Sequence, residues 1–147
     1  MRRALWVFGL LLLVAGCRRT AGGPMAGATT AEGAVTQMLA GAKRQDIQAV
    51  GAMWGTAEAP VRDIVSREEH EKRVLIMLCH LRHDEYRILS NKAAAGGRMV
   101  YEVELKSGPA TVSSPFTTIK NEKSGRYFVE NFNLQPLAPV CAAGAKP

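Results

Sequence analysis

The sequence predicts an α+β domain in which N-terminal helices pack on a curved antiparallel sheet of about four strands. Between residues 35 and 81, apolar residues recur at three- and four-residue spacing, the period of a helix with one covered face. From residue 84 onward the period changes to two, as in a strand that is buried on one face. Helices followed by consecutive antiparallel strands are typical of α+β domains whose helices cover one face of the sheet.

The chain begins with a cationic start and an uncharged run over residues 4–15. As a helix this run would rise about 18 Å, too short for a hydrocarbon core of about 30 Å but typical of a secretory signal peptide. Residues 13–17, LVAGC, resemble the lipobox of bacterial lipoproteins. The resemblance implies a diacylglycerol joined to the thiol of Cys17, cleavage between Gly16 and Cys17, and stable membrane anchoring by two or three acyl chains. The alternatives are a buried helix, or an ordinary secretory signal with a coincidental cysteine.

Arg18 follows the cysteine of the lipobox. In lipoproteins of Gram-negative bacteria, an aspartate at this place commonly retains the protein in the inner membrane. The resemblance therefore implies an outer-membrane location facing the periplasm if the host is Gram-negative. We divide the chain into a signal peptide (1–16), a lipidated flexible tether (17–30), an α+β domain (31–136) and a C-terminal tail (137–147).

Two apolar stripes predict the first two helices. The first stripe, with Thr30 as N-cap, is Val35, Met38, Leu39 and Ala42; the second is Ile47, Val50, Met53 and Trp54. Gly55 can close the second helix in the left-handed conformation.

A third helix begins at a capping box formed by Ser66 and Glu69. Glu68 with Lys72 and Glu69 with Arg73 form favourable i,i+4 pairs. The following segment, VLIMLCHL (74–81), is so apolar that we expect most of its circumference to be covered, by a sheet on one side and helices on the other.

Four strands follow. On the first, Tyr86, Ile88 and Ser90 share a face, and on the second (98–106) one face carries Met99, Tyr101, Val103 and Leu105. A turn at 107–109 leads to a third strand, 110–120, in which Pro115 favours an edge position or a bulge. After a turn at 121–125, residues 126–134 form the last strand.

The helix pair, the buried third helix and the closing segment PFTTIKNEKSGRYFVENFNL (115–134) resemble the NTF2-like family, and more narrowly the small bacterial lipoproteins that carry an NTF2-like domain. The resemblance covers roughly residues 31–135 and implies an NTF2-like or cystatin-like cone, often with a pocket, and frequently a homodimer. The chain departs from the family pattern in two ways: the usual long first helix is interrupted near Asp46, and the strand count is minimal.

The cysteines suggest one disulfide. With Cys17 assigned to lipid, Cys79 and Cys141 are the remaining thiols, and an exported protein sits where disulfides persist. A bridge would tie the tail over the third helix and add on the order of 4 kcal/mol. The alternative is two separate thiols.

The residues that could form a metal site or a ligand pocket could each have a purely structural role instead. His80 and His83 could share a helix face and bind one metal, but no third ligand is fixed by spacing, and a helix C-terminus also favours a cation. Five aromatic residues could line a ligand pocket or simply fill the core: Trp54, Tyr86, Tyr101, Phe116 and Phe132. Phe128 belongs to the same aromatic set.

Composition restricts the partners. The 147-residue chain has a net charge of +6, but four arginines lie in its first twenty residues, and the remaining 15 basic residues against 13 acidic ones give +2. This small excess is unlike that of a nucleic-acid-binding domain. No nucleophile, metal or nucleotide motif occurs, so we expect no cofactor and no metal.

These observations favour a lipid-anchored cell-envelope protein whose domain binds a protein partner or small ligand without catalysis. One alternative is an isomerase-type enzyme with a base and a tyrosine in the pocket, drawn from Tyr86, Tyr101, Asp63 and Asp84. The other is a structural subunit of an envelope assembly.

Overall fold

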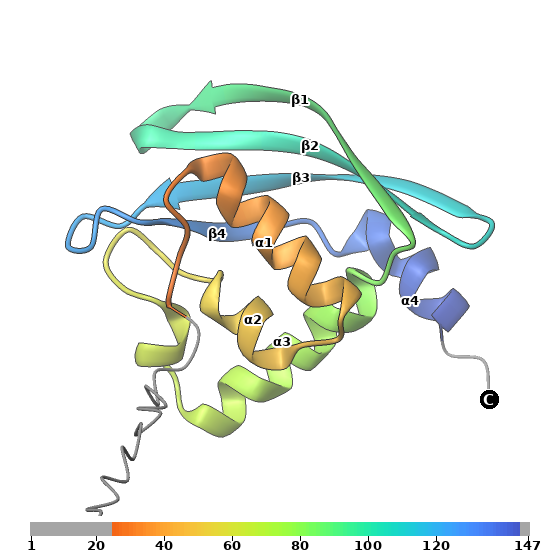
Figure 1. Cartoon of the computed structure of the whole chain (residues 1–147), viewed down its shortest axis with the longest axis horizontal. Coiled ribbons are helices and arrows are strands. Elements are labelled where there is room, and N and C mark those ends of the chain that lie inside the picture. Colours follow the sequence, from red (N-terminus) through yellow and green to blue (C-terminus); the bar gives the residue numbers. More distant parts are fainter. Residues whose placement is uncertain (1–24, 145–147) are drawn as a thin grey trace, which may run out of the picture.

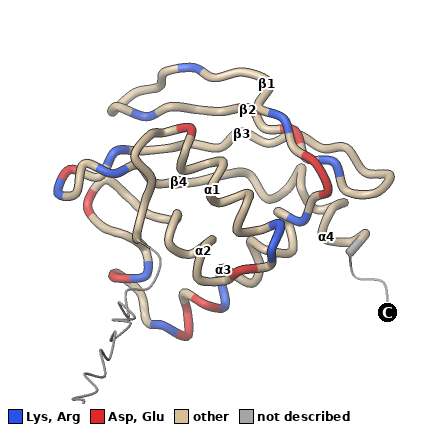
Figure 2. Tube along the Cα trace, in the orientation of Figure 1, with Lys and Arg blue, Asp and Glu red and all other residues tan. Residues whose placement is uncertain are grey.

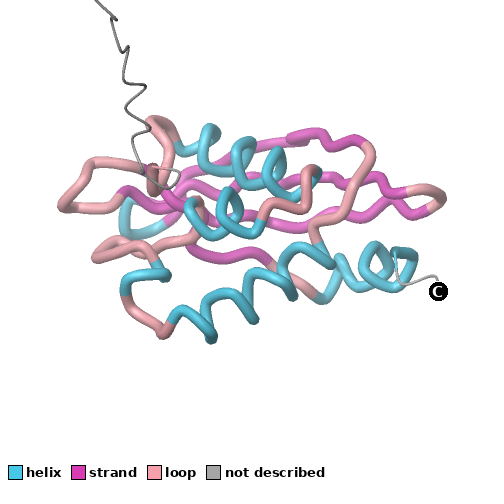
Figure 3. The backbone as a smooth tube through the Cα atoms, turned by 60° about the horizontal axis from the view of Figure 1, so that its bottom comes forward, coloured by secondary structure: helices cyan, strands magenta, loops and turns pink. Residues whose placement is uncertain are grey.

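The computed structural model describes residues 25–144 and shows an α+β fold, as the sequence predicts (Figure 1). A layer of helices lies in front of the strands (Figure 3). Helix α1 packs on β3 and β4, and α2 packs between α1 and α3. The elements are α1 (Ala31–Lys43), α2 (Ile47–Ala52), a 3₁₀ turn (Val61–Asp63), α3 (Arg67–His80), β1 (Glu85–Ala94), a second 3₁₀ turn (Ala95–Gly97), β2 (Arg98–Ser107), β3 (Ala110–Lys120), β4 (Tyr127–Phe132), a third 3₁₀ turn (Gln135–Leu137) and α4 (Ala138–Gly144).

The four strands form an antiparallel meander in the order β1-β2-β3-β4. The inward face predicted for β2 is confirmed, because Tyr101, Val103 and Leu105 are at most 5% exposed and belong to the core. The predicted turns are also present, with Gly108 and Gly125 in the left-handed region that glycine favours. For β2, the alternating pattern therefore identified both the strand and its buried face.

The face of β1 was predicted only in part. Tyr86 lies opposite Leu105 and Ile88 opposite Val103, so both point toward the helices. A bulge then inserts one extra residue, and Ser90 lies opposite Glu102 on the other face. The prediction that Ser90 shares the face of Tyr86 is therefore wrong.

Pro115 occupies an edge-like position within a central strand. It lies opposite Glu102 of β2, but β4 pairs with β3 only from Phe116 onward. At Pro115, β3 thus has no paired neighbour on the β4 side, which is the kind of position where proline is tolerated in a sheet.

The predicted helix starts are confirmed. The hydroxyl of Thr30 accepts a hydrogen bond from the amide of Gly33 at 2.9 Å, and the hydroxyl of Ser66 accepts one from Glu69 at 3.2 Å. On α3 the Glu69–Arg73 pair forms, whereas Arg67 pairs with Glu71 in place of the expected pair between Glu68 and Lys72.

The prediction that Gly55 closes α2 in a left-handed conformation is wrong. The helix ends at Ala52, and Gly55 forms a bridge with Pro60 and donates its amide hydrogen to Val129. A methyl group at this position would lie 2.5 Å from the ring of Phe128. The glycine is needed for close packing against that ring.

Helix α3 is less covered than predicted. Only His70, Val74 and Leu78 are buried on it, while Leu75 and Ile76 are 54% and 49% exposed. The helix packs against α2 and α4, and nothing in the described chain covers its outer side.

Both ends of the domain extend beyond the predicted boundaries. At the start, Ala28 is fully buried and exchanges backbone hydrogen bonds with Tyr127, so the end of the predicted tether is part of the fold. At the other end, Leu137 and Val140 are fully buried, and the predicted tail forms α4. Their three-residue spacing is the helical signal that was missed.

Candidate functional site

The five aromatic residues predicted to line a pocket do not meet around a common cavity. Phe116 and Phe132 stack with ring centroids 4.9 Å apart, and Tyr101 is buried with them in the core. Trp54 lies elsewhere, stacked on His70 at 5.9 Å, and Tyr86 contacts His83 edge-on at the surface. The space between α1 and the sheet is therefore filled by apolar side chains.

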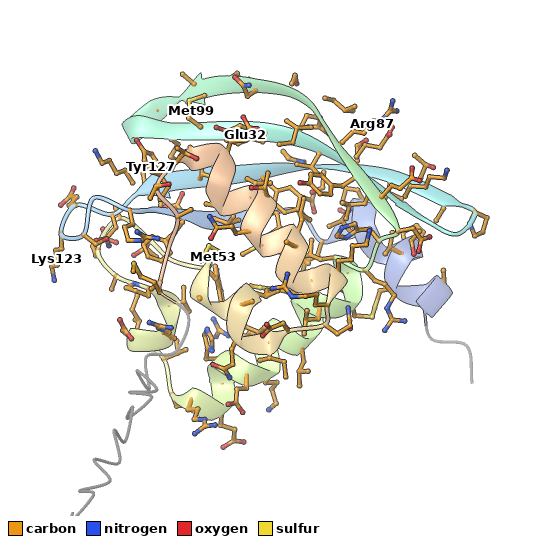
Figure 4. The ribbon with its side chains drawn as sticks, in the orientation of Figure 1. Glu32, Met53, Arg87, Met99, Lys123 and Tyr127 are labelled. Atoms are coloured by element: carbon orange, nitrogen blue, oxygen red, sulfur yellow. A yellow bond between two sulfur atoms is a disulfide. The ribbon has the colours of Figure 1, made fainter. Side chains whose placement is uncertain are left out.

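An isomerase-type site would need an acid within hydrogen-bonding distance of a tyrosine. Burial raises the pKa of Tyr101, and Glu32 and Tyr127 raise it further. Figure 4 shows Glu32, Met99 and Tyr127 around the start of α1. Among the described residues, however, no carboxylate is hydrogen-bonded to a tyrosine hydroxyl.

The two aspartates considered for that chemistry lie apart and have surface contacts. Asp84 accepts a hydrogen bond from the amide of Gly108 at 2.8 Å and so fixes the β2–β3 turn. Asp63 lies 3.8 Å from Arg62, with more than half of its side chain exposed.

His80 and His83 do not share a helix face, because α3 ends at His80. His80 is within 2.9 Å of the carbonyl of Ile76 in the last turn, whereas His83 is 5% exposed and lies 2.7 Å from the carbonyl of Leu81. Across residues 25–144, no three histidine, cysteine or acidic side chains lie together as a metal site would require.

The remaining cysteines form a disulfide. Cys79 near the end of α3 is bonded to Cys141 in α4, with Cα atoms 4.7 Å apart. The two cysteines are 62 residues apart in the sequence, and the segment between them contains all four strands of the sheet. It fixes α4 against the C-terminal half of α3.

Gly16 and Cys17 of the lipobox-like segment lie outside the described residues. Seven residues, 18–24, separate Cys17 from the first described residue, Met25. Within the described chain, no helix has the length and hydropathy needed to cross a bilayer.

The sequence did not predict that two histidines would be buried. His70 and His83 are 8% and 5% exposed, and the Nε2 atom of each is buried without a hydrogen-bond partner. Burial lowers the pKa of both side chains. Each imidazole is therefore held neutral in the folded protein at neutral pH.

The sequence also did not predict two exposed apolar surfaces. The first, which we name the α3 surface, consists of Leu75 and Ile76. It borders both signs of charge on the same helix (Figure 2). The second is the β1 edge, residues 85–94, where Tyr86 and Leu89 are 37% and 50% exposed.

A signal for the α3 surface was present in the sequence. Val74, Leu78 and Leu81 form the stripe that is buried, and Leu75 and Ile76 lie about 100° and 200° away from Val74. An apolar pair so far from the stripe has to be covered by another element or exposed.

No protein-family model matches the chain, and searches of the curated proteins and of the solved structures find no significant match.

Proposed function

We propose that the chain is a lipid-anchored cell-envelope protein whose NTF2-like domain binds a protein partner. The lipobox-like LVAGC supports the anchor, and Cys17 is the modified residue in this proposal. The bond between Cys79 and Cys141 supports export, because disulfides persist in oxidising compartments such as the periplasm. Helices followed by a four-stranded meander support the family assignment.

The observation that carries the binding function is the exposed α3 surface beside a filled core. Leu75 and Ile76 leave about half of their side chains in water, although unoccupied apolar surface is unfavourable by about 25 cal/mol per Å². Their neighbours Glu69 and Arg73 already pair with each other across one turn. An apolar centre flanked by polar groups is the arrangement of a protein–protein interface.

A lipid-labelling experiment tests the anchor. The full-length chain is expressed in a Gram-negative host with an alkyne-bearing fatty acid, and its membrane fraction is analysed. We expect label on the mature protein and none on Cys17→Ala, which should also keep its signal peptide. The control, Cys79→Ala with Cys141→Ala, should label normally. Equal labelling of Cys17→Ala and the parent chain would contradict the proposal.

Site-specific photo-cross-linking in intact cells tests the partner. A photoreactive amino acid at Leu75 or Ile76 is expected to give a discrete adduct that contains a second, different protein. The control position is Lys123, which is exposed in the β3–β4 turn. The same adducts from all three positions, or none from Leu75 and Ile76, would contradict binding at the α3 surface.

A further inference from the structure

The β1 edge is an open side of the sheet. Among residues 25–144, the strand order β1-β2-β3-β4 gives β1 a neighbour on one side only, and no helix of this region packs along it (Figure 1). Of its ten residues only Ile88 is half-buried, and the other nine are exposed. Within the described chain, β1 forms no backbone–backbone hydrogen bond outside its pairing with β2. Its outward amide and carbonyl groups are thus free to pair with another strand.

The bulge in β1 changes which residues lie on the outer face of the strand. Before the bulge, Glu85 and Arg87 lie on the outer face, opposite Lys106 and Glu104 of β2. After the bulge, the outer face carries Ser90 and Lys92. The extra residue, Leu89, therefore brings odd-numbered residues before it and even-numbered residues after it to the same side.

We propose that β1 pairs antiparallel with β1 of a second copy of this chain, about a two-fold axis between Ile88 and Leu89. In antiparallel pairs, residues directly opposite each other share a face. With the bulge in β1, this condition is met in the register where the residue numbers of each opposite pair add up to 177. Glu85 then lies opposite Lys92 of the second copy, Arg87 opposite Ser90, and Ile88 opposite Leu89.

The charges of β1 are complementary in this register. Two-fold symmetry forms the Glu85–Lys92 pair twice, once at each end of the joined strands. Lys92 forms no ion pair within the described chain, and Glu85 contacts only Lys106 at 4.0 Å, with both side chains more than half exposed. In this register Arg87 also comes near Lys92 of the second copy. Its positive charge is already balanced by Glu104, to which it donates a hydrogen bond at 2.7 Å.

The apolar residues of β1 also become covered. Ile88 and Leu89 from both copies meet at the axis, and Leu89 is 50% exposed in the single chain. Lysines and bulges are features that protect edge strands from random pairing. Here the lysine faces a glutamate and the bulge lies at the axis, so both features select this one register over others.

Charge reversal tests the pairing in the full-length chain. Self-association of the protein in detergent micelles is measured by sedimentation velocity over a range of protein concentrations. We expect a dimer, weakened about tenfold in dissociation constant by either Lys92→Glu or Glu85→Lys, because each places like charges opposite each other at both ends. The double variant with both changes should restore the dimer, and melting curves should show that all variants are folded.

Three outcomes would overturn the proposal. One is a monomeric parent protein at every concentration. Another is a double variant as weak as the single ones, because the complementarity requires restoration. The third is a dimer that Leu75→Asp dissociates and the β1 variants do not, because the interface would then be the α3 surface.

Discussion

Removing the disulfide should destabilise the domain by an amount that its loop length sets. The bridge between Cys79 and Cys141 spans 62 residues. The loop-entropy relation gives about 14 cal/mol/K for a loop of this length, or about 4 kcal/mol at 25 °C. For a domain of this size, that corresponds to a melting temperature lower by roughly 12–16 °C.

The native fold should survive reduction, because α4 has its own apolar contacts. Leu137 and Val140 are fully buried, and burying each such side chain contributes about 1.5–3 kcal/mol. The reduced protein should therefore keep its far-UV circular dichroism while its unfolding midpoint in urea falls. Cys79→Ala with Cys141→Ala should match the reduced parent chain.

The measurement is urea unfolding of the parent chain with and without reductant, and of the double variant under both conditions. Reductant should change the midpoint of the parent and leave that of the double variant unchanged. A loss below 1 kcal/mol would refute the entropic reasoning. Loss of native circular dichroism on reduction would refute the independent docking of α4.

Two further predictions concern the interior. Burial lowers the pKa of His70 and His83, so below the unfolded-state histidine pKa of about 6.5 the unfolded state binds more protons than the folded state. The free energy of unfolding should therefore be constant above about pH 7 and fall as the pH drops through about 6.5. Urea unfolding at about pH 7.5 and about pH 5.5 measures this change, which the double variant His70→Gln with His83→Gln should reduce; an equal change in the parent chain and the double variant would contradict the prediction. Gly51→Ala should destabilise the folded domain by about 1–3 kcal/mol, because the added methyl group would lie 2.4 Å from Cε1 of His70. Adding His70→Ala should remove part of this cost. Thermal melts in which the effects of the two changes are simply additive would contradict the contact.

Local signals carried the sequence-based prediction of the fold. The caps at Thr30 and Ser66 and the alternation of β2 depend on residues within a few positions of each other, and all three are present in the structure. The bulge in β1 depends on how that strand meets β2, which the alternating pattern alone does not specify. The assignment of Ser90 failed for this reason.

Burial was harder to predict than secondary structure. An apolar segment such as 74–81 indicates what could be covered, but coverage depends on how many elements remain to pack on it. In this chain α4 is the last described element, and it reaches only the end of α3 near Cys79. Leu75 and Ile76 therefore stay exposed, and the candidate surface became visible only in the structure.

The two proposed interfaces lie on different parts of the domain and can be occupied together. Ala28 pairs with Tyr127 on β4, so the chain enters at the edge of the sheet opposite β1. A two-fold axis through paired β1 strands would place the two β4 strands at the ends of an eight-stranded sheet, about 34 Å apart at roughly 4.8 Å per strand.

Such an arrangement is compatible with one membrane. An axis perpendicular to the sheet keeps the helices of both copies on the same side, and Met25 lies on that side, beside residues of α1 and α2. Eight extended residues span at most about 28 Å, which would be enough for the two proposed lipid anchors at Cys17 to enter the same bilayer. Since the α3 surface also belongs to the helix layer, its partner is expected to be another protein held at that membrane.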